Sequence, residues 1–423
     1  MRKMILILIC FCAVGLFFLH KKPRPVATSN TVSTTPVAEA PMVIATPKPG
    51  LLSAAQDHVI FLGEDSLLYG WGDNNNSKQL GLELHDYVMA PIALETPGQI
   101  ATIHTGGTAS YAITNEGKLL RRGFADVERR LSLTYGQYLP VFVDKRWRKV
   151  EQHWSIAAGI DSDGKLWAWR DLDFFNGEMG PQATRGQVQV ALVPMSSSSQ
   201  WKDFCVGQGS INAIDAQGVW WRSETKDKMD FNGSALQATA SSPRAATVEL
   251  VKVPASANFE KVYCRDNADH VIALDGQHKM WGYGSNKHGE LGNGDDDPYK
   301  QTTAIDATAA AQLNQQSWID VAIGSGFTVA IARDGSLWSW GLNTSRQLGL
   351  KDEQSHHSKP NLVDKTQVWS AVSAGHDFAV AMNQQGVVFT WGTGQFGKLP
   401  DGSILKVQVL PTKMDGLPKG KID

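Results

Sequence analysis

Short runs in which apolar and polar residues alternate recur along the chain from about residue 51 to its end. In one example, residues 327–332 read Phe-Thr-Val-Ala-Ile-Ala, Asp334-Gly335 follows, and residues 336–340 read Ser-Leu-Trp-Ser-Trp. Alternation with a period of two predicts half-buried strands. Asp-Gly between two such runs predicts a tight hairpin, because Gly adopts positive φ without steric penalty. Each unit is therefore predicted to contain two strands, a tight hairpin, a third strand and a longer loop.

Two aromatic marks define the period of these units. The downstream mark is in most units a Trp followed by Gly or Arg, and in most units the upstream mark precedes it by 22 residues, or by 20 in one unit. Counting these marks predicts seven units. The downstream marks are Trp71, Arg122, Trp169, Trp221, Trp281, Trp340 and Trp391, and the upstream marks are Ile100, Trp147, Trp201, Phe259, Trp318 and Trp369.

A three- or four-stranded antiparallel sheet of this size cannot bury both of its faces alone. Stacking such sheets face to face around an axis buries them, and closing the ring protects the ends. The intervals between downstream marks run from about 47 to 60 residues, which suits propeller blades. The pattern therefore predicts an all-β fold, a seven-bladed β-propeller over residues 51–423.

The motif at Asp334-Gly335 through Trp340-Gly341, followed by Gln347-Leu348-Gly349, resembles the regulator-of-chromosome-condensation repeat family. The resemblance implies a seven-bladed propeller that strands from both chain ends often close, so residues 407–410 are expected to complete a blade begun near residue 51. Units two to four depart most from the motif. Many family members also carry a His a few residues after the Gly of the unit, where this chain has Ile156, Ser210, Phe327 and Phe378.

The chain begins with a pattern typical of a signal anchor. Basic residues flank an apolar stretch of 16 residues at 4–19, just short of the roughly 17–25 of a comfortable span. No small-residue cleavage site follows it directly, so residues 1–22 are predicted to form an uncleaved transmembrane helix. Residues 23–50, rich in Pro, Thr, Ala and Ser, predict a disordered linker. We expect a single-pass protein of the bacterial inner membrane with a periplasmic propeller; a cytoplasmic domain and a cleaved, secreted one are the alternatives.

Charge and cysteine content narrow the partners. The formal net charge of -2 and a pI near 6.6 do not favour nucleic-acid binding, which needs phosphate neutralisation. Only Cys205 and Cys264 lie in the repeat region, without zinc-ligand spacing. A disulfide between them and two buried free thiols both remain open.

No linear motif marks a catalytic, cofactor or metal site, so none is predicted. Asp295-Asp296-Asp297 lacks the alternate ligand spacing of a calcium loop, and His356-His357 lacks a third ligand at suitable spacing; both are interpreted as solvated surface loops. The long insertions 171–199, 223–250 and 295–316 are candidate binding loops, because irregular loops on a rigid scaffold often carry function.

These observations favour a non-catalytic, membrane-tethered module that binds another protein. One alternative is a glycan-binding propeller or an enzyme acting on cell-envelope polysaccharide, whose Asp, Glu or His side chains would have to converge at the propeller axis. The founding activity of the resembled family, guanine-nucleotide exchange on a GTPase, is a third hypothesis that requires a cytoplasmic domain.

Overall fold

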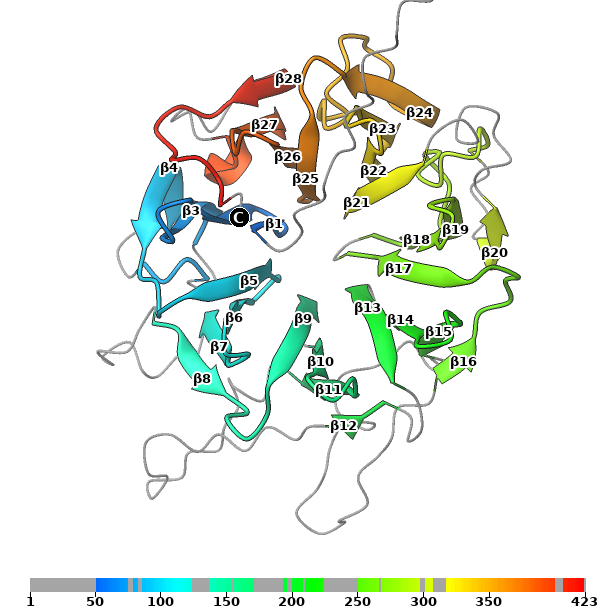
Figure 1. Cartoon of the computed structure of the whole chain (residues 1–423). Helices are drawn as coiled ribbons and strands as arrows, with labels where there is room; N and C mark the ends of the chain where they lie inside the picture. The colour runs from blue at the N-terminus through cyan, green and yellow to red at the C-terminus, as the bar shows by residue number, and fades with distance from the viewer. Residues whose placement is uncertain are drawn as a thin grey trace, which may run out of the picture. The chain divides into compact units, whose positions relative to one another are not determined.

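The computed structural model describes residues 51–74, 79–82, 86–123, 137–153, 156–170, 193–195, 200–207, 210–223, 250–265, 268–296, 301–306, 317–399 and 406–421. These residues form seven four-stranded antiparallel sheets arranged as blades around a central axis (Figure 1). The predicted all-β, seven-bladed propeller is thus confirmed. The predicted anchor at 1–22 and linker at 23–50 lie outside the described residues, and no described helix is long and apolar enough to cross a membrane.

Each blade is built from one continuous stretch of chain, and the first strand of each lies nearest the axis (Figure 1). Blades 1 to 4 consist of β1 (Leu52–Ala54), β2 (His58–Leu62), β3 (Leu68–Asp73) and β4 (Tyr87–Leu94); β5 (Ile100–Thr105), β6 (Ala109–Thr114), β7 (Leu119–Gly123) and β8 (Leu139–Val141); β9 (Trp147–His153), β10 (Ile156–Asp161), β11 (Leu166–Arg170) and β12 (Val193–Pro194); β13 (Trp201–Gly207), β14 (Ser210–Asp215), β15 (Trp220–Ser223) and β16 (Leu250–Lys252).

Blades 5 to 7 follow the same order. They consist of β17 (Phe259–Tyr263), β18 (His270–Asp275), β19 (Met280–Gly284) and β20 (Gln301–Asp306); β21 (Trp318–Gly324), β22 (Phe327–Ala332), β23 (Leu337–Leu342) and β24 (His356–Asp364); β25 (Trp369–Ala374), β26 (Phe378–Asn383), β27 (Val388–Thr393) and β28 (Val407–Lys413), with a 3₁₀ turn, η5 (Gln395–Gly397), between the last two strands. The predicted hairpins join the second and third strands, and Gly335 of the β22–β23 hairpin has φ 82°.

The ring closes differently from the prediction. Residues 407–410 do not complete blade 1: they belong to β28, which pairs with β27 inside blade 7. Closure comes from the last described residues instead. Gly420 pairs with Gly63 of blade 1, and its N–H donates to the Gly386 carbonyl of blade 7 at 2.7 Å. The first residue of a later inner strand makes the same bond, since Trp369 N–H donates to the Gly335 carbonyl at 2.9 Å. The tail therefore supplies the starting position of blade 1.

Buried tryptophans explain why the Trp-Gly and Gln-Leu-Gly motifs occur together. The indole N–H of Trp340 donates to the carbonyl of Glu290, at the Gln position of the preceding blade's loop, at 2.9 Å. Trp391 makes the same bond to Gln347, and Trp71 makes it to Lys398. All three indoles are fully buried. Each motif Trp thus packs in the wedge between two blades and binds the loop of its neighbour.

The 22-residue register is wrong in blade 5. Gly284 pairs with His270 and has φ 104°, as Gly341 pairs with Phe327 and has φ 98°, so Tyr283-Gly284 rather than Trp281-Gly282 corresponds to Trp340-Gly341. The turn between the first two strands is two residues longer here. Phe259 pairs with a residue 16 positions on, whereas Trp318 pairs with one 14 positions on.

Blade 4 has a related misassignment. Trp221 pairs with Ala213 in the way that Trp338 pairs with Ala330, so Ser223 occupies the position of Trp340. Aromatic residues at two neighbouring outward-facing positions make either one fit the spacing. Spacing alone therefore could not identify the buried member of the pair.

Candidate functional site

A cavity of about 430 Å³ lies along the propeller axis and is lined by the inner strands of all seven blades. We call it the axial cavity. Positions along an inner strand are counted here from the upstream mark as position 0, so Lys149 of β9 is at position 2 and Glu151 at position 4; β1 takes its positions from its pairing with β2. At position 2, blades 3 to 6 carry alternating charges, in the order Lys149, Asp203, Lys261 and Asp320.

Lys149 connects blades 3 and 4. Its Nζ lies 2.7 Å from Asp203 Oδ1 and 3.0 Å from Glu151 Oε1, and it donates to the Phe204 carbonyl at 2.6 Å. Burial by itself would lower the pKa of Lys149, but the two carboxylates outweigh it and raise that pKa. The ammonium therefore stays charged and holds the strands β9 and β13 together.

The aspartates at position 2 bind the backbone of the following blade. Asp203 Oδ2 accepts the Val262 N–H at 2.9 Å, and Asp320 accepts the Val372 N–H. Burial raises the pKa of Asp320 to about 6, although the Lys261 charge opposes the shift. An inner strand has one edge without a sheet partner, so its N–H groups need other acceptors. The position-2 carboxylates supply them.

A second set of interblade contacts joins position 4 of one blade to position 5 of the next. At four junctions a position-4 side chain accepts the position-5 N–H at 2.9 to 3.1 Å, and at the junction of blades 4 and 5 a disulfide takes this place. The pairs are Ser373 with Ala54, Ser53 with Thr105, His104 with Gln152, Glu151 with Val206, and Cys205 with Cys264.

The disulfide answers the question that the sequence left open. The Cys205 and Cys264 sulfurs are 2.10 Å apart, with Cα atoms 5.6 Å apart, and 59 residues separate them along the chain. No local spacing rule could reveal this pairing, because only the ring brings β13 and β17 side by side. The two cysteines stand at the same relative positions as the other four pairs.

The axial groups are tightly held. Both oxygens of Asp203 and both oxygens of Glu151 have partners, one oxygen in each case being bound to Lys149. His104 Nε2 accepts an N–H and must be unprotonated there; burial, and then the Arg265 charge, lower the pKa of His104 to about 3. Carboxylates and an imidazole with these partners can bind and orient. They are poorly placed to exchange protons with a substrate.

Sequence reasoning predicted no site residue, and it did not find this constellation. The available signal was the Lys-Asp-Lys-Asp alternation at position 2, visible once the units are aligned on their upstream marks. It also missed two histidines at the family's His position. His58 and His270 stand opposite Gly72 and Gly284, and burial lowers their pKa values to about 3 and about 4.

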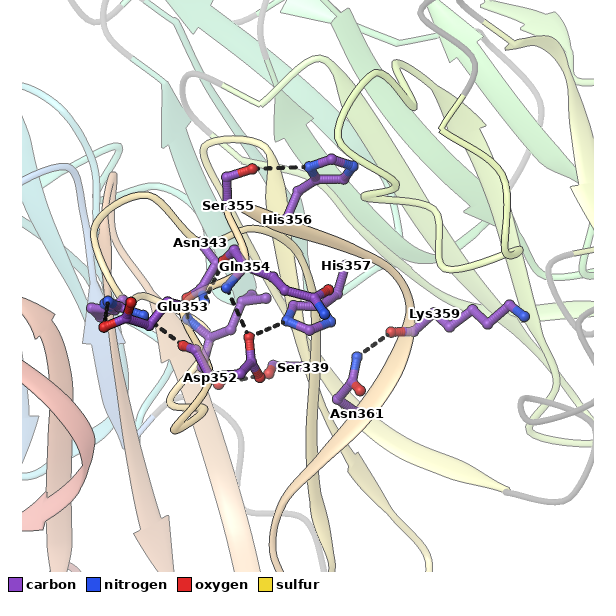
Figure 2. Close-up of polar contacts among 12 residues, drawn as sticks. Ser339, Asn343, Asp352, Glu353, Gln354, Ser355, His356, His357, Lys359 and Asn361 are labelled. Atoms are coloured by element: carbon purple, nitrogen blue, oxygen red, sulfur yellow. Dashed lines mark hydrogen bonds and ion pairs between the residues drawn. The ribbon is translucent and has the colours of Figure 1, made fainter.

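The His356-His357 pair lies at the start of β24 rather than in a loop (Figure 2). His357 Nε2 lies 2.9 Å from Asp352 Oδ1, whereas His356 Nε2 lies 3.3 Å from Asp296 Oδ2 of blade 5. Successive strand residues point to opposite faces, so the two imidazoles diverge. Across the described parts of the chain, no three His, Cys, Asp or Glu side chains gather as metal ligands would.

Several candidate regions cannot be placed. Asp297, the weak motif copy Glu178-Met179-Gly180 and most of the three insertions (171–192, 196–199, 224–249, 297–300 and 307–316) lie outside the described residues. Whether these insertions bind a partner therefore stays a prediction.

An exposed aromatic pair lies at the junction of blades 7 and 1. The rings of Tyr87 in β4 and Phe396 in η5 stack with centroids 5.6 Å apart, and the residues are 39% and 41% exposed. Phe396 has φ 61°, a left-handed conformation that is uncommon for a non-Gly residue. The buried Lys398, 2.6 Å from both Asp57 and Asp377, lies 5.4 Å from the Phe396 ring centroid. We call Tyr87 and Phe396 the seam pair.

Comparison with known proteins agrees with this architecture. Family models described as Regulator of chromosome condensation (RCC1) repeat match residues 334–382 and 318–347. E3 ubiquitin-protein ligase HERC2 of Homo sapiens is 22% identical over 370 residues, which cover 83% of this chain and 7% of that protein. Ultraviolet-B receptor UVR8 of Arabidopsis thaliana is 27% identical over 161 residues, 38% of this chain and 34% of the receptor. The chain thus spans a small part of the length of these curated relatives.

Solved structures share the fold. Prp20p of Saccharomyces cerevisiae, described with its binding properties to Gsp1p and histones, superposes with a TM-score of 0.64 at 16% identity, covering 88% of each chain. Human WBSCR16 superposes with a TM-score of 0.61 at 13% identity, covering 82% of this chain and 94% of that one. Together with the blade topology, these matches show that the chain carries regulator of chromosome condensation repeats folded as a seven-bladed β-propeller.

Proposed function

We propose that this propeller is a non-catalytic module that binds another protein through the seam pair. Exposed aromatic residues are enriched at the centres of protein interfaces, where they bury large area at low entropic cost. Tyr87 and Phe396 are stacked, and Phe396 retains a backbone conformation that a side chain rarely adopts. A strained, exposed residue supported by its surroundings is a reasonable starting point for a functional hypothesis. The seam pair is the observation that carries this proposal.

Two further observations support a binding role. The axial carboxylates and His104 have partners on neighbouring blades, which suits a rigid scaffold better than acid–base catalysis. The solved structure of Prp20p is described with binding to Gsp1p and histones, so one propeller of this fold binds proteins. The identity of a partner for this chain does not follow from that likeness.

We also propose that residues 1–22 anchor the protein in a membrane and that the propeller is exported. The Cys205–Cys264 disulfide supports this location, because structural disulfides persist in oxidising compartments. The bacterial inner membrane and the periplasm remain predictions, and the relatives compared above are eukaryotic. A reporter fused after Asp423 that is active only outside the cytoplasm tests the export; activity of a cytoplasm-specific reporter would overturn it.

Affinity capture with a matched pair of variants tests the binding role. The full chain, the double variant Tyr87→Ser with Phe396→Ser, and the control Leu362→Ser are compared as baits. Leu362 is 39% exposed on blade 6, so the control removes a similar exposed apolar side chain away from the seam pair. We expect a protein that the full chain and the control capture and the double variant loses. Equal capture by all three baits would refute the role of the seam pair.

An envelope polysaccharide-active enzyme is the second candidate, because Glu151, Asp203 and Asp320 do converge on one cavity. It predicts release of soluble fragments from purified peptidoglycan by the wild-type chain and loss of that release in Asp320→Asn. Absence of release from peptidoglycan by the wild type would remove this candidate.

A further inference from the structure

The position-5 N–H groups of the inner strands point toward the axis, away from the second strand of their own blade. At four junctions the preceding blade supplies an acceptor for this N–H: Ser373, Ser53, His104 and Glu151 each accept one at 2.9 to 3.1 Å. At the junction of blades 4 and 5 the disulfide replaces the bond.

Blades 6 and 7 break the pattern. Their position-5 residues are Ile323 and Ala374, and the preceding position-4 residues are Tyr263 and Ala322. An alanine side chain has no acceptor, and no bond from the preceding blade to the Ile323 or Ala374 N–H occurs within the described part of the chain. All four residues line the axial cavity. A buried N–H without an acceptor costs about 1–3 kcal/mol, so these two donors require a group from elsewhere.

The same sector has room for that group. Ala322, Ala371, Ser373 and Ala374 line the cavity from blades 6 and 7, where blades 3 to 5 present Lys149, Glu151 and Tyr263. Small side chains on one side of a ring leave volume beside the large ones on the other. A cavity of about 430 Å³ falls in the range of small-ligand sites, about 300–1,000 Å³.

The charge at this level of the cavity is positive. Arg265, at position 6 of blade 5, lines the cavity, and its charge reaches His58 and His104 on blades 1 and 2, whose pKa values it helps to lower after burial. The carboxylates of Asp203 and Asp320 are at position 2. That is three residues below position 5, or about 10 Å along a strand. Glu151, at position 4, is paired with Lys149.

We propose that the axial cavity binds a small organic carboxylate. Its oxygens accept the Ile323 and Ala374 N–H groups and pair with the Arg265 guanidinium, whose planar fork of donors matches a carboxylate. The ligand thereby provides the acceptor that serine and glutamate side chains provide at other junctions. This site is independent of the seam pair, so either proposal can fail while the other stands.

Calorimetry and thermal unfolding of the full chain test the site, with acetate, succinate and inorganic phosphate as probes at constant ionic strength. We expect succinate or acetate to bind and to raise the melting temperature. The variant Ala322→Ser introduces the hydroxyl that Ser53 and Ser373 place at this position, so it should bind the Ala374 N–H itself. Its carboxylate affinity should fall about tenfold while its melting temperature without ligand is unchanged or higher, since one charged hydrogen bond is worth about that factor.

Arg265→Gln serves as the second variant and should lower carboxylate affinity by about tenfold or more. Lys202→Gln, at position 1 near the cavity mouth, is the control and should keep affinity within about twofold. Unchanged melting with both carboxylates, a response to phosphate but not to carboxylates, or full carboxylate affinity in Ala322→Ser would each overturn the proposal. Loss of affinity in Lys202→Gln equal to that in Arg265→Gln would also overturn it, because the effect would then be general charge.

Discussion

Two halves of the ring hold their blades together at different radii. Blades 5, 6, 7 and 1 are joined away from the axis, where the buried indoles of Trp340, Trp391 and Trp71 donate to the loop of the preceding blade. Blades 1 to 5 are joined at the axis by the contacts between positions 4 and 5, including the disulfide. Only the junction of blades 7 and 1 has both kinds of contact.

This difference accounts for the uneven repeat. Blades 2 to 4 have lost much of the Trp-Gly motif: Arg122 lies 4.1 Å from the Tyr138 ring centroid where other blades have the indole, and Trp169 donates to Tyr111 Oη. The axial contacts connect the same blades. A propeller can therefore lose its outer indole bonds where other interblade contacts hold its inner strands.

The largest expected effect comes from an outer indole. Trp391→Ala removes a fully buried side chain and its bond to Gln347, and should lower the free energy of unfolding by about 3–5 kcal/mol. Trp281→Ala is the control, because Trp281 is only half-buried and bonds within its own hairpin to Asp275. Urea unfolding measures both. Equal losses would mean that Trp281 is, after all, the motif Trp of blade 5.

The disulfide should contribute next. Cys205→Ser combined with Cys264→Ser removes the axial link between blades 4 and 5, where no Trp-to-loop bond is found among the described residues. We expect a loss of about 2–4 kcal/mol, as for other disulfides that close loops of this length. Thermal unfolding of wild type with and without reductant should reproduce the difference. A double variant as stable as oxidised wild type would contradict the importance of the axial contact.

Acid should weaken the ring through its buried neutral histidines. His58, His104 and His270 have pKa values lowered to about 3, 3 and 4, so between pH 6.5 and 4 the unfolded chain takes up protons that the native chain does not. Stability therefore falls as pH drops below 6.5, by about 1 kcal/mol for each histidine at pH 5.5.

Asp320 acts in the opposite direction during the same titration. Its raised pKa of about 6 lets the native chain bind a proton before the unfolded chain does, which offsets part of the histidine effect between pH 6 and 4. Urea midpoints from pH 7.5 to 5 measure the sum, and His270→Gln should flatten the slope. A midpoint that does not change over this range would contradict the neutral state of these side chains.

The smallest effect separates two serines. Ser53→Ala removes the acceptor for Thr105 N–H at a junction without a Trp-to-loop bond, because Arg122 stands there, and should cost about 1 kcal/mol. Ser373→Ala removes the same contact where Trp71 also joins the blades, and we expect a smaller loss. Paired thermal melts compare them. A larger loss for Ser373→Ala would show that the two kinds of contact do not support each other.

Local sequence was sufficient for the blades themselves. Alternating runs, hairpin glycines such as Gly335 and aromatic marks such as Trp340 depend on residues close together in the chain, so seven all-β units could be predicted from them. The prediction failed where a local signal was ambiguous. In blade 5 a turn longer by two residues moved the buried position to Tyr283, while Trp281 kept the expected spacing.

The contacts around the axis were decided by the tertiary structure alone. Lys149 and Asp203, or Cys205 and Cys264, are more than 50 residues apart, and nothing in either local stretch names the other. They meet because closing seven twisted sheets into a ring sets each inner strand beside the next. The closure itself, in which Gly420 supplies the start of blade 1, likewise follows from the free edge that the ring leaves there. The repeat determined the number of blades, and the ring determined which side chains face one another.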